Sequence, residues 1–168
     1  MPISITIRPS ILSDLPYLLD IYNAEVTGGF STFDFEPWTL EKRRVWFDEH
    51  QTDKYILLTA DDASLPVGYA SLSPYRRLDA YSGTVELSVY VDRGHRRRGI
   101  ASALMEAVIG KARENPDINT VVSVITSGNE ASKRLHDRFG FAYCGTMPDV
   151  GVKFGQRLGI DNYVLSVR

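Results

Sequence analysis

Hydrophobic and polar residues alternate from Gly83 to Val91, and this alternation is the clearest strand signal in the chain. Aliphatic side chains fall on one face of that strand, while the other face carries Thr84, Glu86, Ser88 and Tyr90. Shorter apolar or alternating runs predict further strands at 1–8, 55–60, 67–73, 120–125, 141–147 and 162–167. The central strand is therefore expected to present a carboxylate, two hydroxyls and a phenol on one face.

Apolar residues recur every three or four positions between these strands, which is the spacing of helices with one buried face. The predicted helices run from Ser13 or Asp14 to about Val26, from Thr39 to about His50, over 100–113, and from Asn129 to Gly140. Segment 28–37 is typical of a loop, and 61–66 of a turn. The order β-α-α-β-β-β-α-β-α-β-β predicts one α/β or α+β domain, spanning 1–168, with a mixed β-sheet.

The composition favours a soluble domain and excludes several function classes. The chain has 168 residues, of which 43% are hydrophobic, and this suffices for a core without metals or disulfides. The formal net charge of -2 argues against a dedicated nucleic-acid binder. The single cysteine, Cys144, excludes an intrachain disulfide, and no cysteine–histidine spacing suggests zinc. Nothing resembles a signal peptide or a membrane span, so we expect a cytoplasmic protein without a metal.

The stretch from Glu86 to Ala101 carries the most informative chemistry. The strand leads into the basic turn His95-Arg96-Arg97-Arg98-Gly99, and a helix follows. The first amides of a helix lack intrahelical partners and the helix dipole adds positive potential, so phosphate is the natural ligand. Gly99 would let the backbone approach that phosphate without a Cβ. A solvated basic turn is the alternative, since the spacing of the common nucleotide-binding loops is missing.

Two segments along the chain form a recognisable pair. One is Val89-Tyr90-Val91 with Arg96-x-x-Gly99-x-Ala101, and the other is Asn129-Glu130-Ala131-Ser132 with Leu135-His136 and Phe139-Gly140-Phe141. Together they resemble the pyrophosphate-binding motif and the Asn-x-x-Ala/Ser helix of the GNAT superfamily of acyl-CoA N-acyltransferases. The resemblance implies a three-layer fold with helices on both faces of a central sheet. It also implies that this sheet splays between the strands at 83–91 and 120–125.

Further segments extend the resemblance over most of the chain: Ile7-Arg8-Pro9, Ile21-Tyr22-Asn23, Thr32-Phe33-Asp34-Phe35-Glu36-Pro37, Gly68-Tyr69-Ala70, Pro74-Tyr75-Arg76-Arg77 and Gly151-Val152-Lys153-Phe154-Gly155. They resemble the phosphinothricin and methionine-sulfone N-acetyltransferase subfamily. This implies transfer of an acetyl group from acetyl-CoA to the amine of a small amino acid-like substrate, of the phosphinothricin, methionine sulfone or methionine sulfoximine type. It also implies a homodimer, since homodimers are common in the family.

The resemblance assigns the coenzyme to one strand edge and one helix start. The edge at 89–91 would bind the pantetheine arm, with the Val91 amide donating to the thioester oxygen. The pyrophosphate would lie on the basic turn and the first helical amides. The expected cofactor-binding residues are Val89, Tyr90, Val91, Arg96, Arg97, Arg98, Gly99, Ile100, Ala101, Ser102, Asn129 and Ser132.

Glu86 and His136 are the expected catalytic residues. Glu86 matches the proposed general base of the subfamily and would take a proton from the attacking ammonium, directly or through water. An ion pair with an arginine such as Arg76 is the alternative for this carboxylate. His136 stands where many family members have a tyrosine that protonates the departing thiolate, and a structural role stays open. Tyr90 is a second candidate for that step.

The expected substrate-binding residues are Phe33, Glu36, Tyr75, Arg76, Arg77 and Glu86. Arg76 or Arg77 could hold an amino acid's carboxylate bidentately, and the aromatic rings could wall a small side chain. Ordinary core or surface roles are the alternative for each. Lys153 and Phe154 resemble part of a subfamily signature and could reach a partner subunit's site.

Three other functions stay open from the sequence alone. The enzyme could act on another amine, such as a peptide N-terminus or a polyamine. The chain could bind acyl-CoA as a sensor without turnover, although Glu86 argues against this. The cluster of Arg93 with the arginines at 96–98 could bind nucleic acid, although the rest of the chain is balanced in charge.

Overall fold

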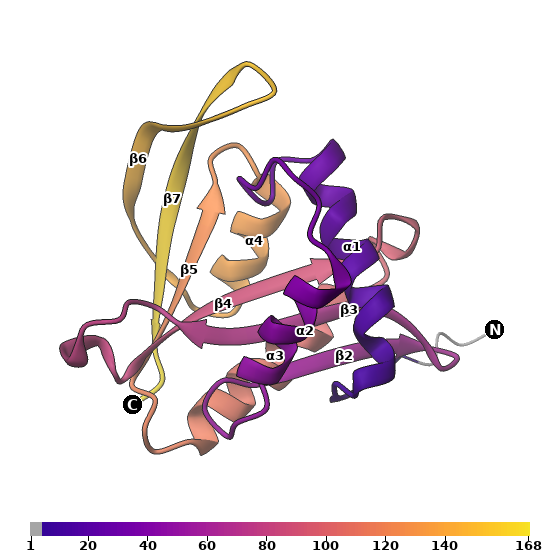
Figure 1. Ribbon diagram of the computed structural model, residues 1–168. Coiled ribbons are helices and arrows are strands. Elements are labelled where there is room, and N and C mark those ends of the chain that lie inside the picture. The colour runs from indigo at the N-terminus through magenta and orange to yellow at the C-terminus, as the bar shows by residue number, and fades with distance from the viewer. Residues whose placement is uncertain (1–4) are drawn as a thin grey trace.

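One seven-stranded mixed sheet organises the protein, with the strand order β1-β2-β3-β4-β5-β7-β6 (Figure 1). A computed structural model describes residues 5–168, so Ile3, which belongs to the predicted first strand, lies outside the described residues. The strands are β1 (Ile5–Pro9), β2 (Leu57–Asp62), β3 (Leu65–Pro74), β4 (Thr84–Val91), β5 (Thr120–Thr126), β6 (Ala142–Lys153) and β7 (Gln156–Ser166). All neighbouring pairs are antiparallel except β4 and β5, which are parallel.

Helices cover both faces of the sheet, which gives the three layers that the resemblance implied (Figure 1). The α-helices are α1 (Leu15–Gly28), α2 (Leu40–Glu49), α3 (Ile100–Glu114) and α4 (Glu130–Arg138). On one face α1 and α2 pack on Leu57 and Tyr69 of the sheet. On the other face α3 packs against β2 to β5 in the larger core, and Leu135 and Phe139, from α4 and its C-terminal end, join it. Short 3-10 turns lie at 12–14, 79–81 and 93–95.

The strands β4 and β5 separate after a short pairing. Their parallel ladder joins only 84–86 with 120–122, and beyond Glu86 the two strands diverge. The predicted α/β fold with a sheet splayed between these two strands is therefore confirmed. The divergence leaves one edge of β4 open inside the sheet, and this opening positions the site described below.

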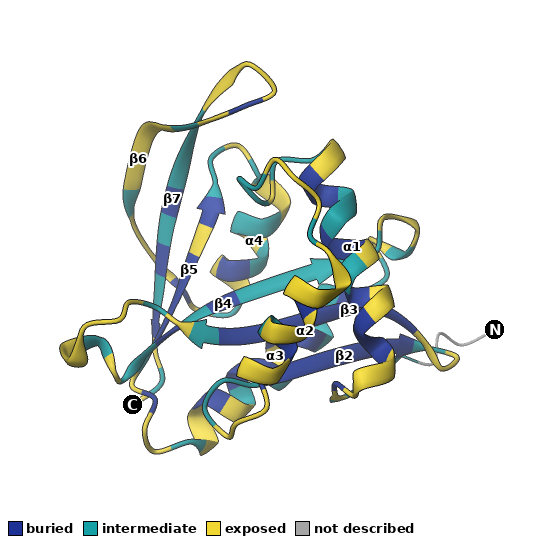
Figure 2. Cartoon of the chain, viewed as in Figure 1, coloured by how far each residue is buried: buried dark blue, intermediate teal, exposed yellow. Residues whose placement is uncertain are grey.

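The hairpin of β6 and β7 is much longer than the predicted strands at 141–147 and 162–167. Register shifts after Tyr143 and Met147 break the alternation, and Pro148 and Gly151 add turn-like signals inside β6. The length of these two strands is therefore set by the pairing between them and not by a local sequence pattern. Figure 2 shows that β6 is largely exposed, whereas β2 and β3 are buried.

The predicted turn at 61–66 is also wrong in its extent. Asp61 and Asp62 end β2, and β3 begins at Leu65, so only Ala63 and Ser64 turn. Both have positive φ angles, 49° and 70°. Tight hairpins of this kind usually contain Asn or Gly, and these residues supply no such signal. In the part of the chain that is described, no helix is long and apolar enough to span a membrane.

Candidate active site

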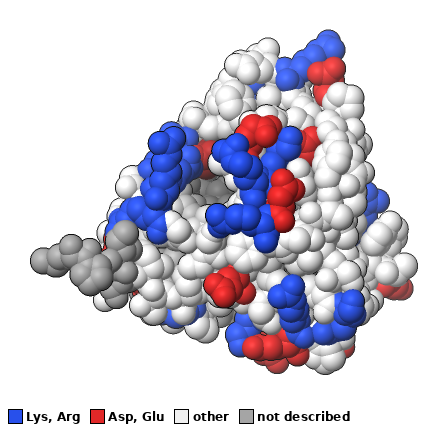
Figure 3. All heavy atoms as spheres, turned by 180° about the vertical axis from the view of Figure 1, so that it is seen from behind, with Lys and Arg blue, Asp and Glu red and all other residues white. Residues whose placement is uncertain are grey.

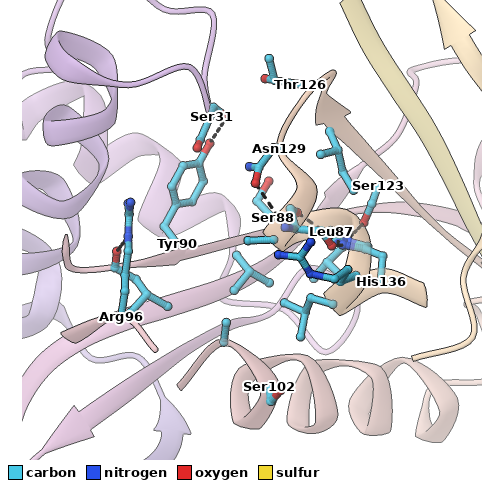
Figure 4. A pocket seen from close by; sticks show the side chains of 18 of the residues that line it. Ser31, Leu87, Ser88, Tyr90, Arg96, Ser102, Ser123, Thr126, Asn129 and His136 are labelled. Atoms are coloured by element: carbon cyan, nitrogen blue, oxygen red, sulfur yellow. Dashed lines mark hydrogen bonds between the residues drawn. The ribbon is translucent and has the colours of Figure 1, made fainter. Parts of the chain in front are cut away.

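A cleft of about 970 Å³ opens where β4 and β5 diverge (Figure 4). Its walls come from these two strands, from α4, from the start of α3 and from the loop after α1. Figure 3 shows Lys and Arg side chains gathered around a hollow on one face of the molecule, and four arginines line the cleft: Arg96, Arg97, Arg134 and Arg138. The cleft therefore combines an open strand edge with positive charge.

Most of the residues expected for the site lie around this one cleft. Those that line it are Phe33, Glu86, Val89, Tyr90, Val91, Arg96, Arg97, Gly99, Ile100, Ala101, Ser102, Asn129, Ser132 and His136. Five expected residues are not among its lining residues, namely Glu36, Tyr75, Arg76, Arg77 and Arg98. Instead, Arg98 donates to Asp62 of β2 at 2.7 Å.

The backbone edge of β4 faces the cleft beyond Glu86. The amide of Asp92, just after β4, donates to Val67 of β3 at 2.8 Å. Backbone groups alternate in direction along a strand, so those of Leu87, Val89 and Val91 point away from β3 and toward the cleft. An extended chain of amides can pair with such an edge, as a neighbouring strand would. The pantetheine arm of coenzyme A has this character.

The turn between β4 and α3 has the backbone geometry of an anion site. Arg97 and Gly99 adopt left-handed conformations, with φ of 61° and 79°. Turns of this kind make concavities lined by backbone amides, and the first amides of α3 have no intrahelical partner. A Cβ added at Gly99 would meet no protein atom within 4 Å. The requirement for glycine there thus comes from its positive φ and from the space left for a ligand, not from crowding by the protein.

Glu25 holds the arginines of this turn from the side of α1. Its carboxylate accepts from Arg96 at 2.7 Å and from Arg93 at 3.2 Å. Burial acts to raise the pKa of Glu25, but the hydrogen bond and charge of Arg96 outweigh it and hold the pKa below its ordinary value. The negative charge is therefore kept, and it anchors the turn to α1.

Glu86 is a half-buried carboxylate on the cleft wall. Burial raises its pKa above the ordinary value. Among residues 5–168 it has no ion-pair partner, so the alternative of a pair with Arg76 is wrong. The Arg76 guanidinium lies instead over the rings of Tyr75 and Tyr81. A carboxylate without a counter-charge in a cleft is suited to accept a proton.

His136 is buried, and both ring nitrogens have partners within the protein (Figure 4). Nδ1 lies 2.8 Å from the Ser132 carbonyl, which can only accept, so Nδ1 carries the proton. Nε2, 2.9 Å from Ser123 Oγ, then accepts from that hydroxyl. Burial lowers the pKa of His136, although the Ser132 carbonyl acts in the opposite direction. The neutral ring therefore orients Ser123.

Ser123 and the loop residues Ser31 and Thr32 line the cleft, although we did not predict them as site residues. Ser123 shares the buried face of β5 with Val121 and Ile125, and a serine among aliphatic neighbours was the available signal. Asn129 caps α4, since its side chain accepts from the Ser132 amide at 3.2 Å. No cluster of metal-ligating residues is present in the described part of the chain.

Residues 16–141 match the model of the acetyltransferase (GNAT) family. The chain belongs to this family. It is 44% identical over 155 residues to a phosphinothricin N-acetyltransferase of Streptomyces coelicolor, an alignment that covers 90% of each chain. It is 40% identical over 158 residues to an L-methionine sulfoximine/L-methionine sulfone acetyltransferase of Pseudomonas aeruginosa, covering 94% of this chain and 91% of the relative.

Solved structures agree with this assignment. A phosphinothricin acetyltransferase of Sinorhizobium meliloti in complex with acetyl-CoA superposes with a TM-score of 0.92 at 27% identity, covering 96% of this chain and 88% of that one. The resemblance to the GNAT superfamily is thereby confirmed, and the protein is an acetyl-CoA-dependent N-acetyltransferase. The open edge of β4 and the left-handed turn before α3 fit this co-substrate.

Proposed function

We propose that this N-acetyltransferase acetylates the primary amine of a small amino acid-like compound of the phosphinothricin, methionine sulfone or methionine sulfoximine type. The observation that carries the proposal is the position of Glu86, a carboxylate without a counter-charge, beside the open edge of β4. The names of the two relatives, each aligned over at least 90% of this chain, support the substrate class. A half-buried carboxylate also suits a substrate that arrives as an ammonium ion.

Glu86 is the general base in this proposal. The substrate ammonium loses one proton to the carboxylate, directly or through a water molecule, and the free amine attacks the thioester carbonyl. The N–C bond forms as the C–S bond breaks, and the second proton of the nitrogen passes to the departing thiolate, directly or through water, which gives the amide and free coenzyme A. The backbone amides of Val89 and Val91 face the cleft, and the Val91 amide would stabilise the charge that develops on the carbonyl oxygen. Arg96, Arg97 and the amides at 99–102 would hold the pyrophosphate.

His136 takes part through Ser123. Its Nε2 accepts a hydrogen bond from the Ser123 hydroxyl, so this nitrogen has no proton to give to the departing sulfur. A thiol of ordinary pKa leaves without a dedicated acid. We therefore assign His136 a positioning role.

The acceptor side of the cleft contains Phe33, and we propose that its ring walls the substrate's side chain. Arg76 or Arg77 would hold the carboxylate of the substrate bidentately. Both lie on the exposed loop that connects β3 with β4, the strand that carries Glu86. Glu36, from the loop after α1, and Tyr75, from the loop after β3, complete the proposed acceptor set.

We further propose that the protein is a homodimer. β6 is an edge strand of the sheet, and its exposed apolar residues are Tyr143, Met147, Val150 and Val152. Exposed apolar edges of this length are commonly covered by a partner. Light scattering should give twice the chain mass, and Val152→Glu should shift the measured mass toward one chain mass; a monomeric wild type would contradict this.

The free, exposed Cys144 suits a reducing compartment, and we propose that the protein is cytoplasmic.

A thiol-release assay tests the substrate class. Acetyl-CoA is supplied with methionine sulfone, methionine sulfoximine, phosphinothricin, free amino acids, polyamines and short peptides. Turnover confined to the glutamate- and methionine-like compounds is the expected result. Turnover confined to peptides or polyamines would contradict the proposed acceptor side. Binding of acetyl-CoA with no turnover on any amine would favour a sensor.

A further inference from the structure

The loop that follows α1 crosses the mouth of the cleft and is held there by side chains from three strands. Three consecutive carbonyls are the acceptors. Phe30 O accepts from Thr126 Oγ1 at the end of β5, Ser31 O from the Tyr90 hydroxyl of β4 at 3.2 Å, and Thr32 O from Lys153 Nζ of β6 at 2.8 Å. β4 lies on one side of the splay, and β5 and β6 lie on the other. The loop thus spans the splay, and Ser31, Thr32 and Phe33 line the cleft beneath it.

Lys153 is the most deeply buried of these three donors. It is only 1% exposed, although it ends the largely exposed strand β6. Its Nζ also donates to Glu25 O at 3.0 Å, near the end of α1. Within residues 5–168 it has no ion-pair partner within 4.0 Å, so two carbonyls are its hydrogen-bonding partners.

Burial of an ammonium group is costly unless its hydrogen bonds are made. Burial lowers the pKa of Lys153, while Glu25 and Asp34 act in the opposite direction. An apolar residue of similar length would fill the same space without this cost. The hydrogen bonds to the carbonyls of Glu25 and Thr32 are therefore what lysine supplies and an apolar residue would not. They join the tip of the hairpin to the loop that lines the cleft.

Two further contacts make the same connection. A Cβ added at Gly151 would lie 2.4 Å from Cε2 of Phe33, so the ring rests directly on the hairpin backbone. The ring of Phe154 packs edge-on against Phe30, with centroids 5.5 Å apart. Residues 151–154 thus support the back of the loop whose other side faces the cleft.

We propose that Lys153 and Gly151 are positioning residues for the amine acceptor. Through Thr32 and Phe33, they set the wall against which the acceptor's side chain packs, and so they set which side-chain sizes are accepted. This inference rests on the proposed function, since it requires an acceptor at Phe33. The acetyl-CoA turn has its own anchors, the carboxylates of Glu25 and Asp62, and should be affected little.

Lys153→Met is the principal variant, because it keeps the length of the side chain and removes the donor. The acceptor KM should rise about tenfold or more, the size expected when buried acceptors lose a charged donor. The KM for acetyl-CoA should stay within about twofold of the wild type, since its site keeps its contacts. Arg157→Met is the matched control: Arg157 is exposed on β7 opposite Val152, and its replacement removes one positive charge from the same hairpin. It should leave both KM values unchanged.

Gly151→Ala tests the second contact without touching a charge. The added methyl must displace the Phe33 ring. The ratio of kcat/KM between a long and a short acceptor should therefore change at least about threefold, which is less than a change of one methylene in an apolar pocket usually causes. Hydrogen exchange of the amides at 30–34, measured without substrates, gives a readout independent of activity. Exchange there should be faster in Lys153→Met and unchanged in Arg157→Met.

The outcomes separate this inference from the proposed function. An active wild type whose acceptor KM and loop exchange are both unchanged by Lys153→Met would overturn the inference. Equal rises in the two KM values would also overturn it, because they would indicate a general structural role. No turnover by the wild type on any amine would instead overturn the proposed function. If Lys153→Met does not fold, Gly151→Ala and Lys153→Arg provide the same comparison of the two KM values.

Discussion

The two halves of the cleft are built in different ways. The half that we propose for acetyl-CoA is one continuous stretch, from the end of β4 through the turn to the first residues of α3, and it presents backbone groups. The half that we propose for the acceptor brings together side chains from β4, β5, the loop after α1 and, behind that loop, the hairpin of β6 and β7. A site made of backbone depends on φ angles and turn geometry. A site made of distant side chains depends on packing far from the substrate.

Glu25 connects the two halves. Its carboxylate binds Arg93 and Arg96 of the turn, while its backbone oxygen accepts from Lys153 of the hairpin. The carboxylate also lies close over Gly29, where an added Cβ would be 2.0 Å from Oε2. Changes at the carboxylate should therefore affect the acetyl-CoA half, whereas changes at Lys153 should affect the acceptor half.

The largest expected effect is that of Glu86→Gln. Removing the proposed general base should lower kcat by about 10²- to 10⁴-fold, the usual contribution of such a group. The affinity for acetyl-CoA, measured by calorimetry, should stay the same because the coenzyme half uses the backbone of β4. An unchanged kcat would remove Glu86 from the mechanism, and a large loss of acetyl-CoA affinity would mean that the two halves are not separable there.

Gly99→Val should affect the other half. Forcing a left-handed φ on a β-branched residue costs about 1–2 kcal/mol, which corresponds to an about 5- to 30-fold higher KM for acetyl-CoA. The acceptor KM should change much less. Gly110→Ala is the control, because Gly110 lies within α3, has no protein atom near an added Cβ, and is not among the residues with positive φ. Equal effects of the two substitutions would contradict a role for the turn.

The pH dependence tests Glu86 without a large change in structure. Burial raises its pKa, and the base works only when it is ionised. The value of kcat/KM should therefore rise with pH along an acid limb centred above 4.5, the ordinary value for this carboxyl. Glu86→Gln should remove that limb from the residual activity. A limb that persists in the variant would belong to another group.

The backbone features of the proposed acetyl-CoA half could be predicted because their signals are local. The alternation in β4 and the basic turn with Gly99 both lie within a few residues of what they determine. Backbone-built features of this kind leave a pattern in the sequence.

The acceptor half could not be predicted to the same depth because its contacts join distant residues. Lys153 and Thr32 are 121 positions apart, and no local pattern pairs them. Register shifts in β6 interrupt the alternation of the sequence, so the length of the hairpin that brings Lys153 to the loop could not be predicted. The direction of Arg98 was equally hidden, since its guanidinium turns to Asp62. A charge pattern identifies a basic turn but not which of its side chains faces the ligand.

The smallest expected effect concerns the junction at Glu25. Its folded-state pKa lies below the ordinary value, so its contribution to stability is fully present above that value and is lost as the pH falls through the folded-state pKa. Arg93 and Arg96 are about half exposed, which limits this contribution to about 1 kcal/mol. Urea unfolding should show Glu25→Gln to be less stable than the wild type at pH 7, with a difference that narrows below pH 4.5. Asp48→Asn, in the exposed pair with Arg44, should show almost no difference at either pH. If the difference in unfolding free energy between the wild type and Glu25→Gln stays constant across this pH range, the charge of the carboxylate does not join the two halves. The packing of the side chain would then account for the difference.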